Sequence, residues 1–398
     1  MKINDVVILV GGKGTRLGKL TKCTAKPLIK IKNKPFLDYL ISKLIKLNFK
    51  NIFLLCSYKK QTFFKLYNNK IIHKSKIICI NEGDPKGTGG ALFKIKKIIK
   101  KPFFLINGDT FFDINFYDLL KKYNKNKMGI IALTNTKNSV NNKKMINLDL
   151  DIKRNILISK KSTKLMNGGI YLLNNKIFKF IDNKSLSLEN DIFPKLINKQ
   201  LLSGIYFKDK FIDIGSKKKL LFIKKNYKML LNKTFFLDRD GVINKENGYV
   251  TNYSKFVFSK GTGKAIKYLN NLNYLVIIIT NQSAIGRNYM SEHNLDTIHN
   301  KMKNYLLKNH NAKIDDIFYA PYYKYSKISF YRKNKNDRKP NNGLFLKAIK
   351  KWNIDISKSF FIGDKFSDKL AADKSKIKFY YKKNNSLDNE IKKIIKIN

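Results

Sequence analysis

Residues 5–17 read DVVILVGGKGTRL, a short apolar run that leads directly into a turn rich in glycine. Residues 234–241 read TFFLDRDG, a second apolar run, which ends in two aspartates. Each stretch is typical of the first strand of an α/β unit together with the loop that follows it. The two stretches therefore predict two α/β units in one chain.

After each of these starts, strand-like runs alternate with amphipathic stretches rich in lysine, such as residues 36–47. This alternation predicts an α/β fold with mostly parallel sheets and helices on both faces. A chain of 398 residues is long enough for two cores. We place the boundary near Asn232, which gives domains 1–231 and 232–398. The further strand-like runs are residues 52–56, 77–80, 103–106, 129–133, 275–279 and 359–362.

The cysteines and the apolar runs predict a cytoplasmic protein that does not enter a membrane. Cys23, Cys56 and Cys79 are odd in number and show no CxxC spacing, which suits reduced thiols. The apolar runs are of strand length and too short to cross a bilayer. Met1 is followed by a lysine and a strand pattern, which differs from a signal peptide.

The formal net charge of +54 raises the alternative of a nucleic-acid-binding protein. Lysine carries almost all of this charge and is scattered along the chain, as on solvated faces. Abundant asparagine, isoleucine, phenylalanine and tyrosine accompany it, and AT-rich codons supply this set. We therefore expect no nucleic-acid partner and a positive field that attracts phosphorylated sugars and nucleotides.

The turn after the first strand has the composition of a phosphate-binding loop. Glycines let the backbone N–H groups approach a phosphate chain, and Lys13 and Arg16 add positive charge. A glycine turn by itself also occurs as a plain tight turn, but five further motifs follow it in order. The residues predicted to bind a nucleotide here are Gly11, Gly12, Lys13, Gly14 and Thr15. The later motifs are Lys26-Pro27-Leu28, Gly87-Thr88-Gly89-Gly90, Asn107-Gly108-Asp109, Asn167-Gly168-Gly169 and Asp213-Ile214-Gly215.

This ordered set resembles the sugar-1-phosphate nucleotidyltransferase family over about residues 3–225. The resemblance implies a Rossmann-like sheet and in-line attack of a sugar phosphate on the α-phosphorus of a nucleotide, with no protein nucleophile. It implies that Arg16 and Lys26 hold the phosphates, that Gly87, Thr88 and Gly89 line the base, that Asp109 and Asp213 bind Mg²⁺, and that Asn167, Gly169 and Glu189 face the sugar phosphate. The family usually carries a Glu-Lys pair before Asn-Gly-Gly. Here Ile158-Ser159-Lys160-Lys161 stands in that region, which leaves the sugar open.

In the second half, Asp238 and Asp240 follow a strand and point to the same side, because side chains alternate. A carboxylate can attack phosphorus when a metal ion shields the repulsion between anions. A second carboxylate can protonate the leaving oxygen and then deprotonate a water molecule. Asp238 suits the first role and Asp240 the second.

Further motifs follow these aspartates in an order that resembles the haloacid-dehalogenase-like phosphatases over about residues 233–382: Thr280-Asn281-Gln282-Ser283, Arg338-Lys339-Pro340, and Gly363-Asp364 with Asp368. The resemblance implies a doubly wound sheet. It also implies that Thr280 and Lys339 stabilise the transferred phosphoryl group and that Asp238, Asp240 and Asp364 hold Mg²⁺.

Gly248-Tyr249-Val250, Arg287 and Arg338-Lys339-Pro340 are similar to the heptose-bisphosphate and histidinol-phosphate phosphatase branch. The resemblance places Arg287 and Arg338 at the substrate. That branch commonly carries a zinc loop, but the corresponding positions here read Ala320-Pro321-Tyr322 and Lys335-Asn336-Asp337. We therefore expect no zinc and a loop held by other contacts, including its tyrosines.

Together, the two resemblances imply consecutive steps in making a nucleotide-activated heptose: loss of the 7-phosphate from a heptose 1,7-bisphosphate, then transfer of GMP from GTP to heptose 1-phosphate. One alternative is a hexose-1-phosphate nucleotidyltransferase fused to a histidinol-phosphate-type phosphatase. Another is a phosphatase joined to a decayed, regulatory nucleotide-sugar-binding domain. The sequence leaves open the base of the nucleotide and whether the chain forms a homo-oligomer.

Overall fold

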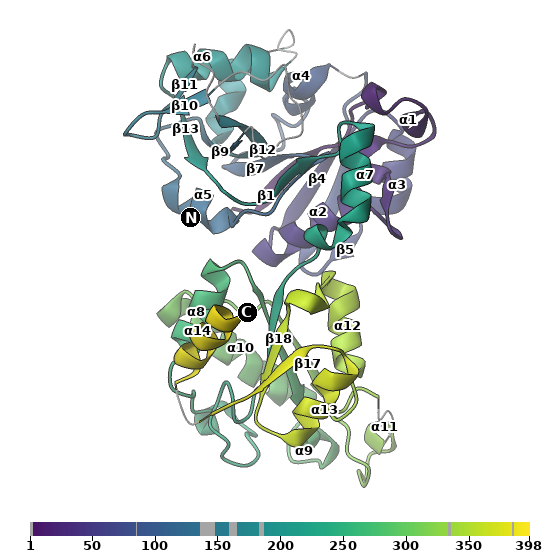
Figure 1. Cartoon of the computed structure of the whole chain (residues 1–398), viewed down its shortest axis with the longest axis vertical. Coiled ribbons are helices and arrows are strands. Elements are labelled where there is room, and N and C mark those ends of the chain that lie inside the picture. Colours follow the sequence, from purple (N-terminus) through teal and green to yellow (C-terminus); the bar gives the residue numbers. More distant parts are fainter. Residues whose placement is uncertain are drawn as a thin grey trace. The chain divides into compact units, whose positions relative to one another are not determined.

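The computed structural model describes residues 3–84, 86–135, 148–158, 165–182, 187–332, 336–383 and 386–398. The chain separates into two compact units, Met1–Leu230 and Leu231–Asn398 (Figure 1). None of the helices in the described ranges combines the length and the apolar character that crossing a bilayer requires.

The first unit is built on a ten-stranded sheet whose central strands are parallel. Strand β1 (Asp5–Leu9) lies between β7 (Phe103–Asn107) and β4 (Asn51–Cys56), and β4 pairs with β6 (Ser75–Asn81). The three middle residues of β1 are all buried, because helices cover both faces of the sheet. The other strands of the unit are β2 (Lys30–Ile31), β3 (Lys34–Pro35), β5 (Ile71–Ile72), β8 (Thr110–Phe112), β9 (Gly129–Asn135), β10 (Leu148–Leu150), β11 (Ile156–Ile158), β12 (Leu165–Leu173), β13 (Leu202–Tyr206) and β14 (Phe211–Asp213).

Helices lie on opposite faces of this sheet (Figure 1). Leu92 of α4 and Leu196 of α6 pack in one core cluster with Val7 and Leu105. On the other face, the ring of Phe116 in α5 lies edge-on to Phe104. The helices are α1 (Lys19–Cys23), α2 (Phe36–Leu44), α3 (Lys60–Tyr67), α4 (Gly87–Phe93), α5 (Phe116–Lys122), α6 (Phe193–Asn198) and α7 (Lys217–Lys225), with short helical turns η1 (Thr15–Leu17), η2 (Lys26–Leu28), η3 (Ile45–Leu47), η5 (Asn175–Phe180), η6 (Leu188–Ile192) and η7 (Tyr227–Leu230).

This sheet differs at both ends from the mostly parallel arrangement that the sequence predicts: at one edge, β5 pairs antiparallel with β6, and larger differences lie at the other. Strand β12 runs antiparallel to both β7 and β9, and β10 and β11 extend the sheet as an antiparallel pair. The apolar runs show which segments form strands. Strand direction, however, depends on which strands become neighbours, and a single run carries no information about that.

The second unit has a five-stranded sheet, all parallel, in the order β17-β16-β15-β18-β19. Helices cover both faces, as expected for a doubly wound fold (Figure 1). The strands are β15 (Thr234–Leu237), β16 (Leu275–Asn281), β17 (Asp316–Ala320), β18 (Phe360–Gly363) and β19 (Lys378–Tyr381). The helices are α8 (Thr262–Asn271), α9 (Ser283–Gly286), α10 (Glu292–His310), α11 (Ser329–Arg332), α12 (Gly343–Trp352), α13 (Phe366–Lys374) and α14 (Leu387–Ile397), with turns η8 (Tyr253–Lys255) and η9 (Ile356–Lys358).

Both sheets confirm the α/β fold class that the alternation of segments predicts. In each unit, the parallel strands end at one edge of the sheet, where loops can bring polar side chains together. Asp238 follows β15, Thr280 lies near the end of β16, and Asp364 follows β18. In the first unit, Gly11 follows β1 and Glu82 follows β6.

We expect Phe345→Ala to destabilise the second unit by about 3–5 kcal/mol, because Phe345 is fully buried in α12 between the rings of Phe236 and Phe361. Trp352 is the only tryptophan of the chain and is buried in the same helix, so its fluorescence in a urea titration reports this unit. Leu346→Ala is the matched control: this side chain is 54% exposed, and the change should stay within about 0.5 kcal/mol. Equal effects of the two variants would contradict the packing described here.

Candidate functional site

The first unit contains a cavity of about 380 Å³ at the carboxyl ends of β1 and β7. Most of the residues predicted to bind the nucleotide line it: Gly11, Gly12, Gly14, Thr15, Arg16, Lys26, Gly87, Thr88 and Asp109. Lys13 is exposed and Gly89 is buried within α4, and neither lines the cavity. Glu82, which the sequence analysis did not single out, also lines it.

Positive groups gather where the glycine turn meets the end of β14. Gly14 has φ +67°, and a Cβ there would lie 3.2 Å from the Cβ of Lys26. A Cβ on Gly215 would lie 3.4 Å from Arg16 Nη2 and 3.5 Å from Lys26 Nζ. Two glycines therefore leave room in front of two cations, an arrangement that suits a phosphate chain.

The two predicted metal ligands of this unit, Asp109 and Asp213, lie on adjoining loops, since Ile214 N donates to Asp109 O at 2.9 Å. Each carboxylate is paired with a lysine, Asp109 with Lys26 and Asp213 with Lys219. Burial acts to raise the pKa of Asp109, but Lys26 and the hydrogen bonds outweigh it and hold this pKa below its usual value. Two carboxylates beside a phosphate site fit a divalent cation that takes its other ligands from phosphate and water.

The residues predicted to face the sugar phosphate meet in one hydrogen-bond network centred on Tyr171. Glu189 accepts from Tyr171 at 3.2 Å and from Thr88 at 2.9 Å. Asn167 donates to the Tyr171 hydroxyl at 2.8 Å and accepts from the N–H of Gly169 at 2.8 Å. The network joins η6 at Glu189, α4 at Thr88 and β12 at Asn167. In the segment that replaces the family's Glu-Lys pair, the structure describes Ile158. Ser159, Lys160 and Lys161 lie outside the described residues.

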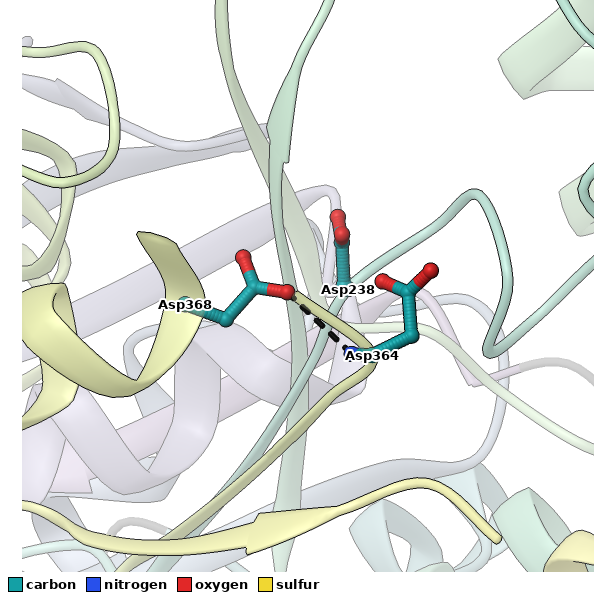
Figure 2. Close-up of side chains that lie close together, drawn as sticks. All are labelled: Asp238, Asp364 and Asp368. Atoms are coloured by element: carbon teal, nitrogen blue, oxygen red, sulfur yellow. Dashed lines mark hydrogen bonds between the residues drawn. The ribbon is translucent and has the colours of Figure 1, made fainter. Parts of the chain in front are cut away.

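The second unit holds a cavity of about 500 Å³ at the carboxyl ends of its strands. It is lined by predicted residues from three segments of the chain: Asp238, Asp240, Thr280, Arg338 and Lys339. A cluster of three aspartates lies at this edge (Figure 2). Oxygens of Asp238, Asp364 and Asp368 all lie within 4.8 Å of one another.

The acidic cluster has the features of a divalent-cation site. Oδ1 of Asp364 is buried and has no hydrogen-bond partner among the described residues. Oδ2 of Asp368 accepts from the backbone N–H of Asp364 at 3.2 Å, which fixes the two residues relative to each other (Figure 2). Gly241 has φ +83°, and any Cβ there would collide with Oδ2 of Asp364. These residues fit a cation with oxygen ligands, because the unpartnered carboxylate oxygen needs a positive charge.

The cluster includes Asp368 and does not include Asp240, which the sequence predicts as a ligand. The reason is Arg239, whose guanidinium is buried and whose Nη2 donates to both carboxylate oxygens of Asp240 at 2.7 and 2.8 Å. Asn244 and Gln282 also donate to Asp240, at 3.0 and 2.8 Å. Burial alone would raise the pKa of Asp240, but Arg239 and these donors hold it below its usual value.

Lys339 contacts two members of the cluster. Its Nζ lies 3.0 Å from Oδ1 of Asp238 and 2.6 Å from Oδ1 of Asp368, and it donates to the carbonyl of Ile279 at 3.0 Å. Burial raises the pKa of Asp238 to about 7; Lys339 opposes this increase, and the carboxylates of Asp368 and Asp240 add to it. Asp238 and Asp240 are thus two residues apart in sequence but differ in acidity, because burial outweighs the effect of Lys339 at Asp238, whereas Arg239 and the other donors outweigh burial at Asp240.

The two arginines predicted at the substrate are near each other at the rim. Arg338 Nη1 donates to the carbonyl of Tyr322 at 3.0 Å, and burial together with the charge of Arg287 lowers the pKa of Arg338. Arg287 does not line the cavity but stacks on the ring of Tyr323, 3.7 Å from its centroid. The loop that begins at Ala320-Pro321-Tyr322 is therefore held partly by its tyrosines. At its far end Asp337 pairs with Lys347, while Lys335 lies outside the described residues.

Several contributors could not be assigned a role from the sequence. Lys219 lies in α7, beyond the loop that follows Asp213, and it is one of three consecutive lysines in the sequence. Tyr171 is one aromatic residue within a buried strand. Asp368 follows Asp364 by four residues, a helical spacing that signals a shared site only when the helix start is known. Arg239 stands between two predicted functional residues, and its side-chain direction gives no local signal.

We expect Mg²⁺ to stabilise the second unit by about 1–3 kcal/mol at roughly 10 to 100 times its Kd, because the ion relieves repulsion among the clustered carboxylates. Asp364→Asn should abolish this increase while leaving the unit at least as stable without the ion. The measurement is urea unfolding followed by Trp352 fluorescence, which does not report the first unit. Asp373→Asn, on the exposed side of α13, should keep the full effect of Mg²⁺. Equal stabilisation of Asp364→Asn and the unaltered chain would contradict this assignment.

Comparisons with known proteins divide the chain at the same place as its two units. Residues 5–229 match the family described as Nucleotidyl transferase, and residues 233–392 match the family described as Polynucleotide kinase 3 phosphatase. The UTP-bound UGPase from Acinetobacter baumannii has a TM-score of 0.50 at 16% identity, covering 57% of this chain and 94% of that one. At this identity the likeness shows the fold of the first unit only.

Two curated relatives each match one unit over most of their own length. The D-glycero-beta-D-manno-heptose-1,7-bisphosphate 7-phosphatase of Haemophilus ducreyi is 40% identical over 146 residues, 37% of this chain and 80% of the relative. The D-glycero-alpha-D-manno-heptose 1-phosphate guanylyltransferase of Campylobacter jejuni is 34% identical over 217 residues, 53% of this chain and 94% of the relative. The chain therefore belongs to the nucleotidyl transferase family through its first unit and to the family of the heptose-1,7-bisphosphate 7-phosphatases through its second.

Proposed function

We propose that the chain makes a GDP-activated heptose in two consecutive steps. The second unit removes the 7-phosphate from a heptose 1,7-bisphosphate, and the first unit transfers GMP from GTP to the resulting heptose 1-phosphate. The observation that carries this proposal is the presence, in one chain, of units whose relatives act by name on successive intermediates. Removal of the 7-phosphate from a heptose 1,7-bisphosphate, the compound named for one relative, gives a heptose 1-phosphate, the compound named for the other.

In the phosphatase step, a carboxylate oxygen of Asp238 attacks the phosphorus, and the bond between phosphorus and O7 breaks to give a phospho-aspartate. Lys339, whose Nζ lies 3.0 Å from Asp238, neutralises the phosphoryl oxygens, and Thr280, which lines the same cavity, donates a hydrogen bond to them. Mg²⁺ held by Asp238, Asp364 and Asp368 would shield the charges that repel each other during attack.

Asp240 is suited to the proton transfers of this step. Arg239 fixes its orientation and favours its ionised form before substrate binds. The negative phosphate of a bound substrate raises the pKa of Asp240 and so favours the protonated form, which donates to O7. The carboxylate left behind accepts a proton from the water that hydrolyses the phospho-aspartate.

In the transferase step, a phosphate oxygen of the sugar attacks the α-phosphorus of GTP, and pyrophosphate leaves. Arg16 and Lys26 converge in front of Gly215, where they can neutralise the triphosphate. Mg²⁺ held by Asp109 and Asp213 would neutralise further phosphate charge. The network around Tyr171 holds Glu189 and Asn167 in fixed positions, which suits orientation of the sugar phosphate.

The setting we propose for both steps is the cytoplasm, where nucleoside triphosphates are supplied. The net charge of +54 then attracts two anionic substrates and needs no nucleic-acid partner. Because the product of one unit is the substrate of the other, both units must accept the same anomer, although the names of the two relatives differ in this respect.

The proposal is tested by incubating the full chain with Mg²⁺, GTP and each anomer of D-glycero-D-manno-heptose 1,7-bisphosphate in separate tubes. The products are measured by mass spectrometry. We expect one of the two anomers to give phosphate, pyrophosphate and GDP-heptose. Phosphate release without a nucleotide sugar would leave only the phosphatase step. If a nucleotide sugar formed only from hexose 1-phosphates, the sugar substrate would be a hexose and not a heptose.

The two activities should be separable by substitution, because each unit has its own site. Asp238→Asn, which removes the attacking oxygen's charge, should lower phosphate release by at least about 10³-fold and spare pyrophosphate release from heptose 1-phosphate and GTP. Arg16→Ala should lower pyrophosphate release by about 10²–10³-fold and spare phosphate release. Each variant is the control for the other, measured by both product assays. Loss of both activities in either folded variant would contradict two independent sites.

A further inference from the structure

The loop that follows β17 leads to Arg338, which the sequence predicts at the substrate. Arg338 lines the cavity of the second unit, and its Nη1 donates to the carbonyl of Tyr322, near the start of this loop, at 3.0 Å. Residues 321–338 contain no cysteine or histidine, so the side chains that hold the loop are of other kinds. The direction of Arg338 therefore depends on how these side chains hold the segment around Tyr322.

The first part of this loop folds back on itself into a small lobe, residues 323–332. The N–H of Tyr323 donates to the carbonyl of Tyr331 at 3.1 Å, which closes the lobe. Most of the side chains in the lobe are exposed, so apolar burial contributes little to holding it in place. Because the lobe follows Tyr322 directly, a shift of the lobe also moves the carbonyl that Arg338 contacts.

Glu292, the first residue of α10, fastens this lobe to the rest of the unit. Its Oε1 accepts a hydrogen bond from the phenol of Tyr331 at 2.9 Å, and its Oε2 accepts one from the phenol of Tyr319 in β17, also at 2.9 Å. Burial and the bond to Glu292 raise the pKa of Tyr331, so its hydroxyl stays protonated and can donate. Hydrogen bonds to a carboxylate are about twice as strong as those between neutral groups. One carboxylate thus ties the lobe to a helix and a strand.

The lobe has a second fastening that does not involve Glu292. The guanidinium of Arg287 stacks on the ring of Tyr323, 3.7 Å from its centroid, and the N–H of Gly286 donates to the carbonyl of Pro321 at 3.0 Å. These contacts hold the start of the lobe, and the bond from Tyr331 to Glu292 holds its end. Loss of that bond should therefore loosen the lobe without unfolding the unit.

We propose that Glu292 is a positioning residue of the phosphatase step. Through Tyr331 it fixes the lobe, and the lobe in turn holds the carbonyl of Tyr322 against Arg338. Glu292 and Tyr331 are not among the described residues that line the cavity, so they act on the substrate only through Arg338. This inference rests on the proposed phosphatase step. Because the acidic cluster and Lys339 are untouched, the chemistry at phosphorus should not depend on Glu292.

The experiment compares two phenol deletions at the same carboxylate, Tyr331→Phe and Tyr319→Phe, in the full chain. Phosphate release is measured from the anomer of D-glycero-D-manno-heptose 1,7-bisphosphate that the unaltered chain hydrolyses and from p-nitrophenyl phosphate, which has no sugar. Tyr331→Phe should raise the KM for the heptose bisphosphate by about 10-fold, while kcat and both constants for p-nitrophenyl phosphate stay within about 2-fold. Tyr319→Phe leaves the bond between Glu292 and the lobe in place, and every constant should stay within about 2-fold.

Arg338→Ala tests whether Tyr331 acts through Arg338. In that background, Tyr331→Phe should cause no further increase in KM, because the contact that it serves is already lost. Additive effects of the two substitutions would overturn the proposal, as would an unchanged KM in Tyr331→Phe or an equal increase in Tyr319→Phe. An equal loss of activity toward both substrates would show a merely structural role.

Trypsin gives a test that needs no sugar substrate. Lys324 and Lys327 are exposed in the lobe, and cleavage there requires the lobe to open. Cleavage should be about 10-fold faster in Tyr331→Phe than in Tyr319→Phe, and Glu292→Ala should match the faster variant. Equal rates would overturn anchoring by Glu292. If the unaltered chain hydrolyses p-nitrophenyl phosphate but not the heptose bisphosphate, the proposed substrate fails, and the cleavage rates still decide whether Glu292 holds the lobe.

Discussion

The buried ammonium of Lys339 is the charge on which the site of the second unit depends. Three carboxylates whose oxygens lie within 4.8 Å of one another repel strongly when they are removed from water. Lys339 contacts two of them, at 3.0 and 2.6 Å, and anchors to the carbonyl of Ile279. Removing one partner from such a buried group costs about 3–5 kcal/mol, because the remaining charge is left uncompensated. The charge that holds the acids together is also available to a phosphoryl group.

In the first unit, lysines also compensate the charge of carboxylates beside the proposed phosphate site. Asp109 and Asp213 are each paired with a lysine, and Lys26 also faces the space in front of Gly215. Both units therefore place lysine between carboxylates and the proposed phosphate position. In the first unit, Lys26 also holds the pKa of Asp109 below its usual value, which suits a ligand of a divalent cation.

Within the second unit, two neighbouring aspartates differ in acidity because burial dominates at one and hydrogen-bond donors, above all a guanidinium, dominate at the other. Burial raises the pKa of Asp238 to about 7, whereas the guanidinium of Arg239 and the other donors hold the pKa of Asp240 below its usual value. Enzymes often shift the pKa values of two neighbouring carboxyl groups in opposite directions, so that each group takes a different catalytic role. Arg239 achieves this from the position between them, since its side chain folds back onto Asp240.

The sequence by itself determined the α/β class, the order of motifs and most of the residues that line both cavities, because apolar periodicity and turn composition are local properties. Only the tertiary structure decided that Asp368 and not Asp240 joins the acidic cluster, that β12 runs antiparallel, and that Glu82 lies behind Gly11. These features depend on contacts between segments far apart in the chain. Gly11 and Glu82, or Gly241 and Asp364, become neighbours only when separate strands align side by side, and no local pattern specifies which strands will do so.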